Sequence, residues 1–251
     1  MNQFENSLVA MKNLLDAVGE THWAGWIATD LQDWREDRDS SHHLAAYGGM
    51  GSFNDMWITR GNRHTVTRAQ EPWANSLFVW LKAICFHLAK HPTEFLTAEA
   101  LSRLVGRSVP SLSAFVGGEN APPSMRGYAT PVFKFKGWRC LRCGFSETSS
   151  GDIEDMVAEN LLPGLVFRSC ETLTLDRLVD EVLALTIEEA NELREKLTTA
   201  IKQNGIALND REDWMRPCPN CGQDDTAVYR WVVSGDGQNS VEPSADNLPM
   251  R

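Results

Sequence analysis

Cys140-Leu141-Arg142-Cys143-Gly144 and Cys218-Pro219-Asn220-Cys221-Gly222 share one design, in which two cysteines enclose two residues and are followed by glycine. Two such pairs supply four thiolates, the donor set of a closed tetrahedral metal site. The glycine tolerates a positive φ, so backbone N–H groups can approach the sulfurs. The sequence therefore predicts one structural Zn²⁺ ion with four ligands, Cys140, Cys143, Cys218 and Cys221.

Segments typical of β-strands flank the two cysteine pairs. Residues 131–138 alternate apolar and basic side chains before the first pair, and the β-rich residues 227–233 follow the second pair. Pairing of these segments as strands would bring the cysteine pairs together. The long separation between Cys143 and Cys218 therefore indicates an insertion into a compact β unit.

The paired cysteines resemble the zinc-ribbon superfamily, which implies a small β unit held by zinc. Cys-Pro-X-Cys-Gly also occurs in rubredoxin-like iron sites, so donor softness and geometry leave iron as an alternative. A redox-active pair fits less well, because a thioredoxin-type motif has one reactive pair at the start of a helix.

The beginning of the chain predicts its location. Residues 1–7 contain no basic region that leads into an apolar segment, so they do not resemble a secretory signal. We expect the chain in the reducing cytoplasm, where disulfides are disfavoured. The most apolar stretch, residues 77–88, contains Lys82 and His87 and is too short to cross a bilayer, so no membrane association is expected.

The composition is that of a globular protein. A chain of 251 residues with 42% hydrophobic content and nine tryptophans can form one large or two modest domains. We predict an α+β protein with three parts: a mainly helical domain (1–119), a small β zinc ribbon (120–235, comprising 120–149 and 214–235) interrupted by an acidic helical hairpin (150–213), and a flexible tail (236–251).

Apolar residues recur at helical spacing in the amino-terminal part. The spacing predicts helices over residues 4–18, 23–34 and 73–89. Gly19 supplies an end for the first helix, and Pro92 follows the third. This part is therefore expected to be mainly helical.

The insertion predicts a pair of helices. Leucines and valines between residues 173 and 185 form one amphipathic pattern, and Thr186 and Glu189 have the spacing of a capping box that starts a second helix. Asn204-Gly205 ends this helix. Such a hairpin could dock on a partner protein or pack on the amino-terminal domain.

The formal net charge of −10 is unevenly distributed. Residues 147–213 hold 16 acidic and 6 basic side chains, so this segment alone accounts for the net charge. Residues 120–146 contain basic and aromatic side chains and no acidic one, which is typical of nucleic-acid contacts. The candidates are Lys134, Lys136, Arg139 and Arg142. The alternative is a solvated strand face, with Phe133 and Phe135 turned into the core.

Residues 47–55, Tyr-Gly-Gly-Met-Gly-Ser-Phe-Asn-Asp, are the other distinctive segment. Three glycines in four residues predict a sharply turning loop that caps a helix or turns N–H groups toward an anion. The candidate ligand-binding residues are Gly48, Gly49, Gly51, Ser52, Asn54 and Asp55. The alternative is a structural loop whose polar side chains bond the local backbone.

This loop carries a resemblance. The chain from His43 through the loop to the helix at 73–89 resembles an uncharacterised bacterial domain built around a GGMGSFND sequence, over about residues 20–92. The resemblance implies a bacterial origin and a place in conflict or accessory gene islands. It implies no activity, cofactor or catalytic residue.

No catalytic residue is assigned from the sequence. The polar candidates around the glycine loop are His22, His42, His43, His64, Asp55 and Glu71. Their spacing supports none in particular, because adjacent side chains such as those of His42 and His43 diverge by about 100° on a helix. We therefore predict a non-catalytic, zinc-stabilised binding protein that acts as a protein-interaction adaptor or as a subunit of a bacterial complex. The alternatives are a nucleic-acid binder that uses the basic strand and an enzyme with its site at the glycine loop.

Overall fold

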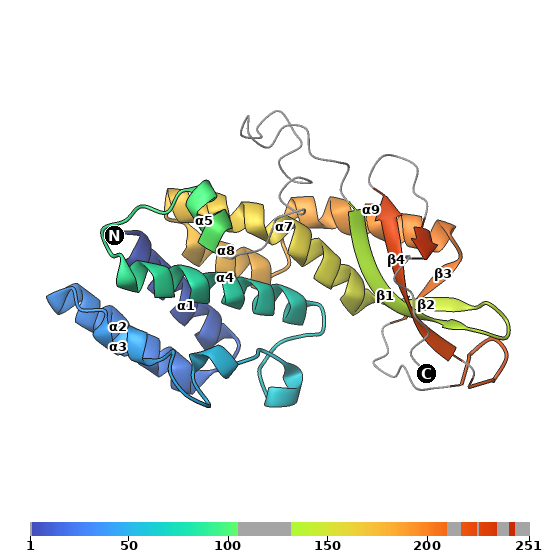
Figure 1. Cartoon of the computed structure of the whole chain (residues 1–251), viewed down its shortest axis with the longest axis horizontal. Coiled ribbons are helices and arrows are strands. Elements are labelled where there is room, and N and C mark those ends of the chain that lie inside the picture. The colour runs from blue at the N-terminus through green and yellow to red at the C-terminus, as the bar shows by residue number, and fades with distance from the viewer. Residues whose placement is uncertain (1, 105–131, 210–216, 225, 235–240, 244–251) are drawn as a thin grey trace. The chain divides into compact units, whose positions relative to one another are not determined.

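The computed structural model describes the chain apart from residues 1, 105–131, 210–216, 225, 235–240 and 244–251 (Figure 1). The described residues form an α+β structure with a mainly helical amino-terminal region, which confirms the predicted fold class. Most of the predicted tail lies outside the described residues. Within it, Val241–Pro243 forms a short strand.

Among the described residues, helices and strands occur in successive groups along the chain, first helices, then two strands, then helices again and then three strands. The helices are α1 (Gln3–Ala17), α2 (Thr21–Asp37), α3 (Ser41–Ala45), α4 (Gln70–Lys90), α5 (Ala98–Leu104), α7 (Ser150–Thr172), α8 (Leu175–Leu183) and α9 (Glu188–Gln203), with 3₁₀ turns η1 (Phe53–Asp55) and η2 (Arg60–Asn62). The strands are β1 (Val132–Cys140), β2 (Ser146–Ser149), β3 (Ile206–Asn209), β4 (Thr226–Ser234) and β5 (Val241–Pro243). The helices predicted at 4–18, 23–34 and 73–89 are confirmed as α1, α2 and α4.

Two compact units share the chain. One contains Met1–Val109 and Leu162–Ile187, and the other contains Pro110–Leu161 and Glu188–Arg251. In the first unit α8 packs on α1 and α4. Its apolar side chains are buried there: Leu175, Leu178, Val179 and Val182. The amphipathic face of α8 is therefore used inside the protein, which answers the question that the sequence left open.

Two buried polar side chains of α1 fix this packing. The Gln3 Nε2 group donates to the carbonyl oxygens of Leu96 and Cys170, at 3.1 and 3.2 Å, and its Oε1 accepts from the N–H of Leu96 at 2.7 Å. The Asn6 Oδ1 atom accepts from the N–H of Leu175, the first residue of α8, at 3.3 Å. Each side chain thus satisfies backbone groups that burial would otherwise leave unpaired.

Helix α7 was not predicted from the sequence. The run from Leu161 to Phe167 is buried at every position, so this part of the helix has no polar face to mark a helical period. It also contains Pro163, which indicates a helix end in a sequence pattern because proline removes one backbone hydrogen bond. The insertion therefore holds three helices where the pattern predicted two.

The second unit contains a five-stranded sheet in the order β3-β2-β1-β4-β5. Strands β1 and β4 are antiparallel over their full length, from Val132 opposite Ser234 to Cys140 opposite Thr226. This pairing confirms the predicted strand partners of the two cysteine pairs. Strands β2 and β3 are parallel and join the other edge of β1, and neither was predicted.

The polar anchor in α1 can be tested by Gln3→Ala. The change leaves buried backbone groups of Leu96 and Cys170 without partners, so we expect a loss of about 2–3 kcal/mol in the free energy of unfolding, measured by urea denaturation. Gln32→Ala is the matched control, because Gln32 is exposed and, among the described residues, its side chain bonds Glu36 on its own helix. Equal small losses in both variants would contradict the anchoring role.

Candidate functional site

The two cysteine pairs fold into matching turns. In the first turn the N–H of Cys140 donates to the carbonyl of Phe145 at 2.8 Å, and the N–H of Gly144 donates to the carbonyl of Cys140 at 2.9 Å. In the second turn Cys218 and Gly222 make the equivalent bonds, at 2.8 and 2.7 Å. Both glycines have positive φ angles, of 74° and 71°, as the sequence predicts from the left-handed conformation that glycine tolerates.

The four sulfurs meet in one cluster. Their Sγ atoms all lie within 4.8 Å of one another, and the pairs Cys140–Cys221 and Cys143–Cys218 are each separated by 3.6 Å. A tetrahedral ion with metal–sulfur bonds of about 2.3 Å needs sulfurs about 3.8 Å apart. The donor set therefore fits a single thiophilic ion with four protein ligands, and it leaves no coordination position for a substrate.

Two aromatic side chains pack beside the sulfur cluster. Cys140 and Cys218 are buried together with Trp138, and Phe145 packs against them. The rings of Trp138 and Phe145 lie 5.7 Å apart. Cys143 and Cys221 lie at the surface. The site is therefore anchored in a small apolar core and open to chelators on its other side.

The thiols differ in their pKa values. Hydrogen bonds from the Asn220 side chain and the Phe145 backbone lower the pKa of Cys143 to about 6. For Cys221 the hydrogen bond from Gln223 also lowers the pKa, but partial desolvation and the three neighbouring sulfurs outweigh it and raise the pKa to about 12. Four sulfurs this close cannot all be thiolates at neutral pH unless a cation compensates their charge.

The basic candidates lie on β1 and on the first turn. Lys134 and Lys136 are residues of β1, but their side chains are outside the described part. Arg139 and Arg142 are exposed on either side of Cys140, and Phe135 is buried. The burial of Phe135 agrees with the predicted strand alternation, while contact with nucleic acid stays a prediction.

The glycine loop is held by its own polar side chains. The Asp55 Oδ2 atom accepts from the N–H groups of Gly51 and Ser52, at 2.8 and 3.2 Å, and Ser52 Oγ accepts from the N–H of Asn54. These bonds form a capping box around η1. The Asn54 Nδ2 group donates to the carbonyl of Tyr47 at 3.1 Å. The structure therefore shows the local bonding of the structural alternative, and a ligand at this loop stays a prediction.

The glycines of this loop are needed for its backbone conformation. A Cβ atom at Gly48, Gly49 or Gly51 would meet nothing within 4 Å, so close packing does not require them. Gly49 and Gly51 have φ angles of 83° and 74°, which other residues rarely adopt. The turn they make delivers Phe53, which is fully buried, to a cluster of aromatic rings: Trp23, Tyr47 and Phe78.

A buried carboxylate joins two of the histidines. Asp30, on α2, is 2% exposed, and its Oδ1 and Oδ2 atoms bond the Nδ1 atoms of His42 and His43 at 2.5 and 2.6 Å. The His43 Nε2 atom lies 3.0 Å from the hydroxyl of Tyr47, which also donates to the carbonyl of Lys82 at 3.2 Å. Burial and the charges of Cys85 and Asp30 raise the pKa of Tyr47 well above its usual value.

The sequence pattern did not reveal this network, because its centre, Asp30, lies 12 residues before His42 and on another helix. Adjacent rings diverge on a helix, yet the two oxygens of one carboxylate can accept from both. The other polar candidates lie elsewhere: His64 Nε2 is 3.3 Å from Glu20, the cap of α2, and Glu71 bonds Arg60. His22 is exposed. The structure brings none of these three to Asp30.

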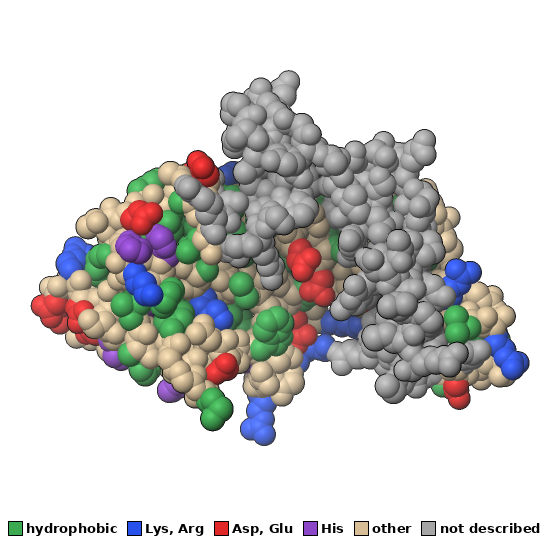
Figure 2. All heavy atoms as spheres, viewed as in Figure 1, with side chains coloured by type: hydrophobic (Ala, Val, Ile, Leu, Met, Phe, Trp, Pro, Cys, Tyr) green, Lys and Arg blue, Asp and Glu red, His purple; other side chains and the backbone are tan. Residues whose placement is uncertain are grey.

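Charges around the network are mainly acidic. Residues 30–42 hold five acidic side chains and two arginines: Asp30, Asp33, Glu36, Asp37 and Asp39 against Arg35 and Arg38. Figure 2 shows acidic side chains at the left of the view, over the end of α2, with basic side chains beside them. An anionic ligand is therefore disfavoured on this part of the surface.

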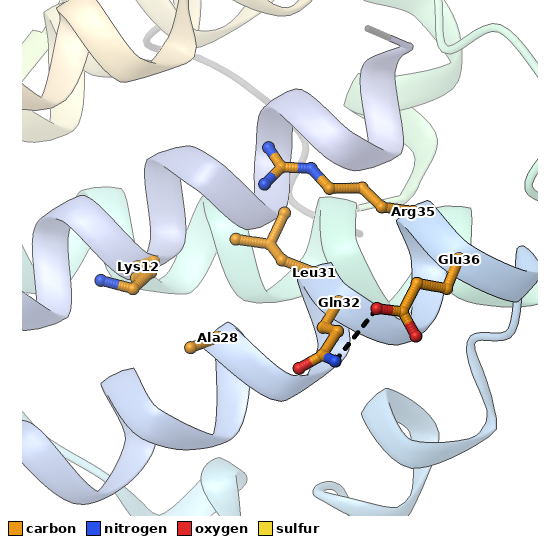
Figure 3. A pocket seen from close by; sticks show the side chains of 6 residues that line it. All are labelled: Lys12, Ala28, Leu31, Gln32, Arg35 and Glu36. Carbon is orange, nitrogen blue, oxygen red and sulfur yellow. Dashed lines mark hydrogen bonds between the residues drawn. The ribbon is translucent and has the colours of Figure 1, made fainter.

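A shallow hollow lies between α1 and α2 (Figure 3). Its volume is about 340 Å³, and its lining residues are Lys12, Ala28, Leu31, Gln32, Arg35 and Glu36. The charged groups of this lining already have partners: Lys12 pairs with Asp16, Arg35 pairs with Glu5, and Glu36 accepts from Gln32. No predicted site residue lines the hollow.

Thiol alkylation distinguishes the metal ligands from the other cysteines. Cys85 and Cys170 are buried, and burial raises the pKa of each thiol to about 12, so neither is a reactive thiolate near pH 8. We expect iodoacetamide at pH 8 to modify none of the six cysteines rapidly in the metal-loaded protein. After a chelator it should modify Cys143 first, because Cys143 is exposed and its pKa is lowered to about 6, and after denaturation all six, counted by mass spectrometry. Labelling of Cys85 or Cys170 in the chelated, folded protein would contradict the assignment.

Part of the chain matches a known protein family. Residues 16–67 match a family described as a domain of unknown function, DUF6966. The match contains Asp30, His42, His43 and the glycine loop, and it ends before the cysteines. No curated protein and no solved structure matches the chain. Among the described residues, no helix has the length and apolar character needed to cross a bilayer.

Proposed function

We propose that this chain is a zinc-stabilised binding protein, whose metal is structural and non-catalytic, and that it serves as a protein-interaction adaptor or as a subunit of a bacterial complex. The observation that carries the proposal is the closed set of four sulfurs within 4.8 Å. Zinc is the ion that such a set most commonly holds as a structural site. Catalytic zinc sites keep a position open for water or substrate, and four cysteine ligands leave none.

A bound metal would hold the two cysteine turns rigid at the surface of the protein. Leu141 lies between the first two cysteines and is 51% exposed, although it is a large apolar side chain. Arg142 and Pro219, in the same two turns, are also exposed. A side chain held on a metal-bound turn loses little further freedom when it binds, which favours affinity. These turns are the part of the second unit best suited to contact a partner.

Helix α8 is a weaker candidate for that contact. Its leucines and valines pack on α1 and α4, so a partner could reach them only by displacing the core of the first unit. The proposed binding surface is therefore the pair of cysteine turns, and not the apolar face of the insertion.

Nucleic acid is the second candidate partner, on one specific observation. Arg139 and Arg142 are both exposed beside the sulfurs, and the Arg139 guanidinium reaches within 3.5 Å of the position that a Cβ would take on Gly144. Glu147, the first acidic residue after them, is buried. Two exposed arginines beside the four sulfurs could bind phosphates.

Capture from the native host tests the protein-binding proposal. Tagged wild-type chain should retain a stoichiometric protein after nuclease treatment, and Leu141→Asp should weaken its retention about tenfold or more, because the change places a charge in an apolar contact. Met50→Asp is the matched control, since Met50 is fully exposed in the other unit. A partner that both variants retain equally would not be bound through the cysteine turns.

A salt titration decides between the two partner classes. The protein-binding proposal expects no salt-dependent affinity for a fluorescent oligothymidylate. A nucleic-acid binder would lose affinity steeply with salt, and an Arg139→Gln/Arg142→Gln double variant would reduce the slope of log K against log salt by about 1.4, from about 0.7 per phosphate contact. That result, measured by fluorescence anisotropy, would replace the protein partner with a nucleic acid.

A further inference from the structure

The two histidines bound to Asp30 are not equivalent. His43 is 1% exposed, and both of its ring nitrogens have partners, Asp30 at Nδ1 and Tyr47 at Nε2. The His42 side chain is 35% exposed, and only its Nδ1 has a partner among the described residues. His43 therefore suffices to explain a buried structural bond, whereas the Nε2 of His42 is left available at the surface.

Proton positions follow from the acceptor. Both Asp30 oxygens lie at hydrogen-bond distance from an Nδ1 atom, and a carboxylate can only accept. Each Nδ1 therefore carries its hydrogen. In the neutral ring of His42 the lone pair then lies on Nε2, which is the arrangement of a histidine base oriented by a buried aspartate.

The ring of His42 is held in place on a second side. It stacks on Trp26, with centroids 4.3 Å apart and planes 20° apart. Trp26 and Asp30 are both on α2, one turn apart. The backbone of α3 is tied down as well, because the Ser40 hydroxyl donates to the carbonyl of Ala89 at 2.7 Å. His42 is thus oriented before any substrate binds, as a catalytic base requires.

We propose that His42 is a general base, with Asp30 as its positioning residue, and that the pair activates water to hydrolyse a neutral or cationic ester. This activity goes beyond the proposed binding function and belongs to the other unit. The charge of the substrate follows from the charges of residues 30–42, where five carboxylates outnumber two guanidiniums. Phosphate esters and other polyanions are repelled there.

The reaction balances without a cofactor. The Nε2 of His42 takes a proton from water as the water oxygen bonds to the carbonyl carbon of the ester. The tetrahedral intermediate then collapses, the bond from carbon to the leaving oxygen breaks, and the imidazolium returns its proton to that oxygen. The products are a carboxylic acid and an alcohol, and Asp30 keeps its charge throughout.

Hydrolysis of p-nitrophenyl acetate by the full chain tests the proposal. We expect His42→Gln to reduce the protein-dependent rate tenfold or more, a conservative share of the 10²–10⁴-fold typical of general bases, because glutamine can still donate to Asp30 but cannot accept a proton. His22→Gln is the control, since His22 is an exposed histidine on the same unit, and its rate should stay within twofold. The dianion p-nitrophenyl phosphate should not be hydrolysed.

Nitrogen NMR tests the role of Asp30 independently of turnover. The wild-type protein should show His42 in the Nδ1–H tautomer, and Asp30→Asn should shift it toward the Nε2–H tautomer and lower the rate of ester hydrolysis, whereas loss of a merely structural contact would change the tautomer alone. An Nε2–H tautomer in the wild-type protein would overturn the proposal, whether or not the variant folds. A His42→Gln variant with an unchanged rate, or an equal loss in His22→Gln, would overturn it as well.

Discussion

The antiparallel pairing of β1 with β4 is the interaction on which the carboxy-terminal half depends. It places Cys140 opposite Thr226, and so brings the first cysteine turn, at the end of β1, to the second turn, just before β4. The segment between the two cysteine turns, which includes α7, α8 and α9, therefore begins and ends at the same place, beside the paired strands. A metal ion bound by the four sulfurs would cross-link the two turns. Its free energy of binding would offset the entropy lost when the ends of the long segment between them are brought together.

Because the two ends of this segment are held together, the chain can contribute two separate stretches to each of the two units. Residues 162–187 leave the sheet-containing unit and complete the helical one, where Asn6 caps α8 and Gln3 bonds Cys170. Neither unit is therefore a continuous stretch of sequence. The same packing removes the leucine face of α8 from the surface, which leaves the cysteine turns and the Asp30 network as the two places where function is best sought.

The sequence predicted the elements that are determined by the pattern of neighbouring residues. Helices α1, α2, α4, α8 and α9 each have a periodic apolar face, and the two cysteine turns carry their glycines at the positions that need a positive φ. The patterns failed where burial is complete or the partner is distant. Helix α7 is buried all round at 161–167, strand β2 is Ser-Glu-Thr-Ser and wholly buried, and Asp30 meets His42 only because α3 folds back on α2. No local period or spacing encodes those tertiary contacts.

The central claim is that four thiolates of one chain hold one zinc ion. X-ray absorption spectroscopy at the zinc edge, on the full chain with its metal content measured in parallel, tests it most directly. The account predicts one zinc per chain and a first shell of four sulfurs at about 2.3 Å, with no nitrogen or oxygen ligand. A shell with nitrogen or oxygen ligands, iron in place of zinc, or a chain purified under reducing conditions that binds no metal would contradict it.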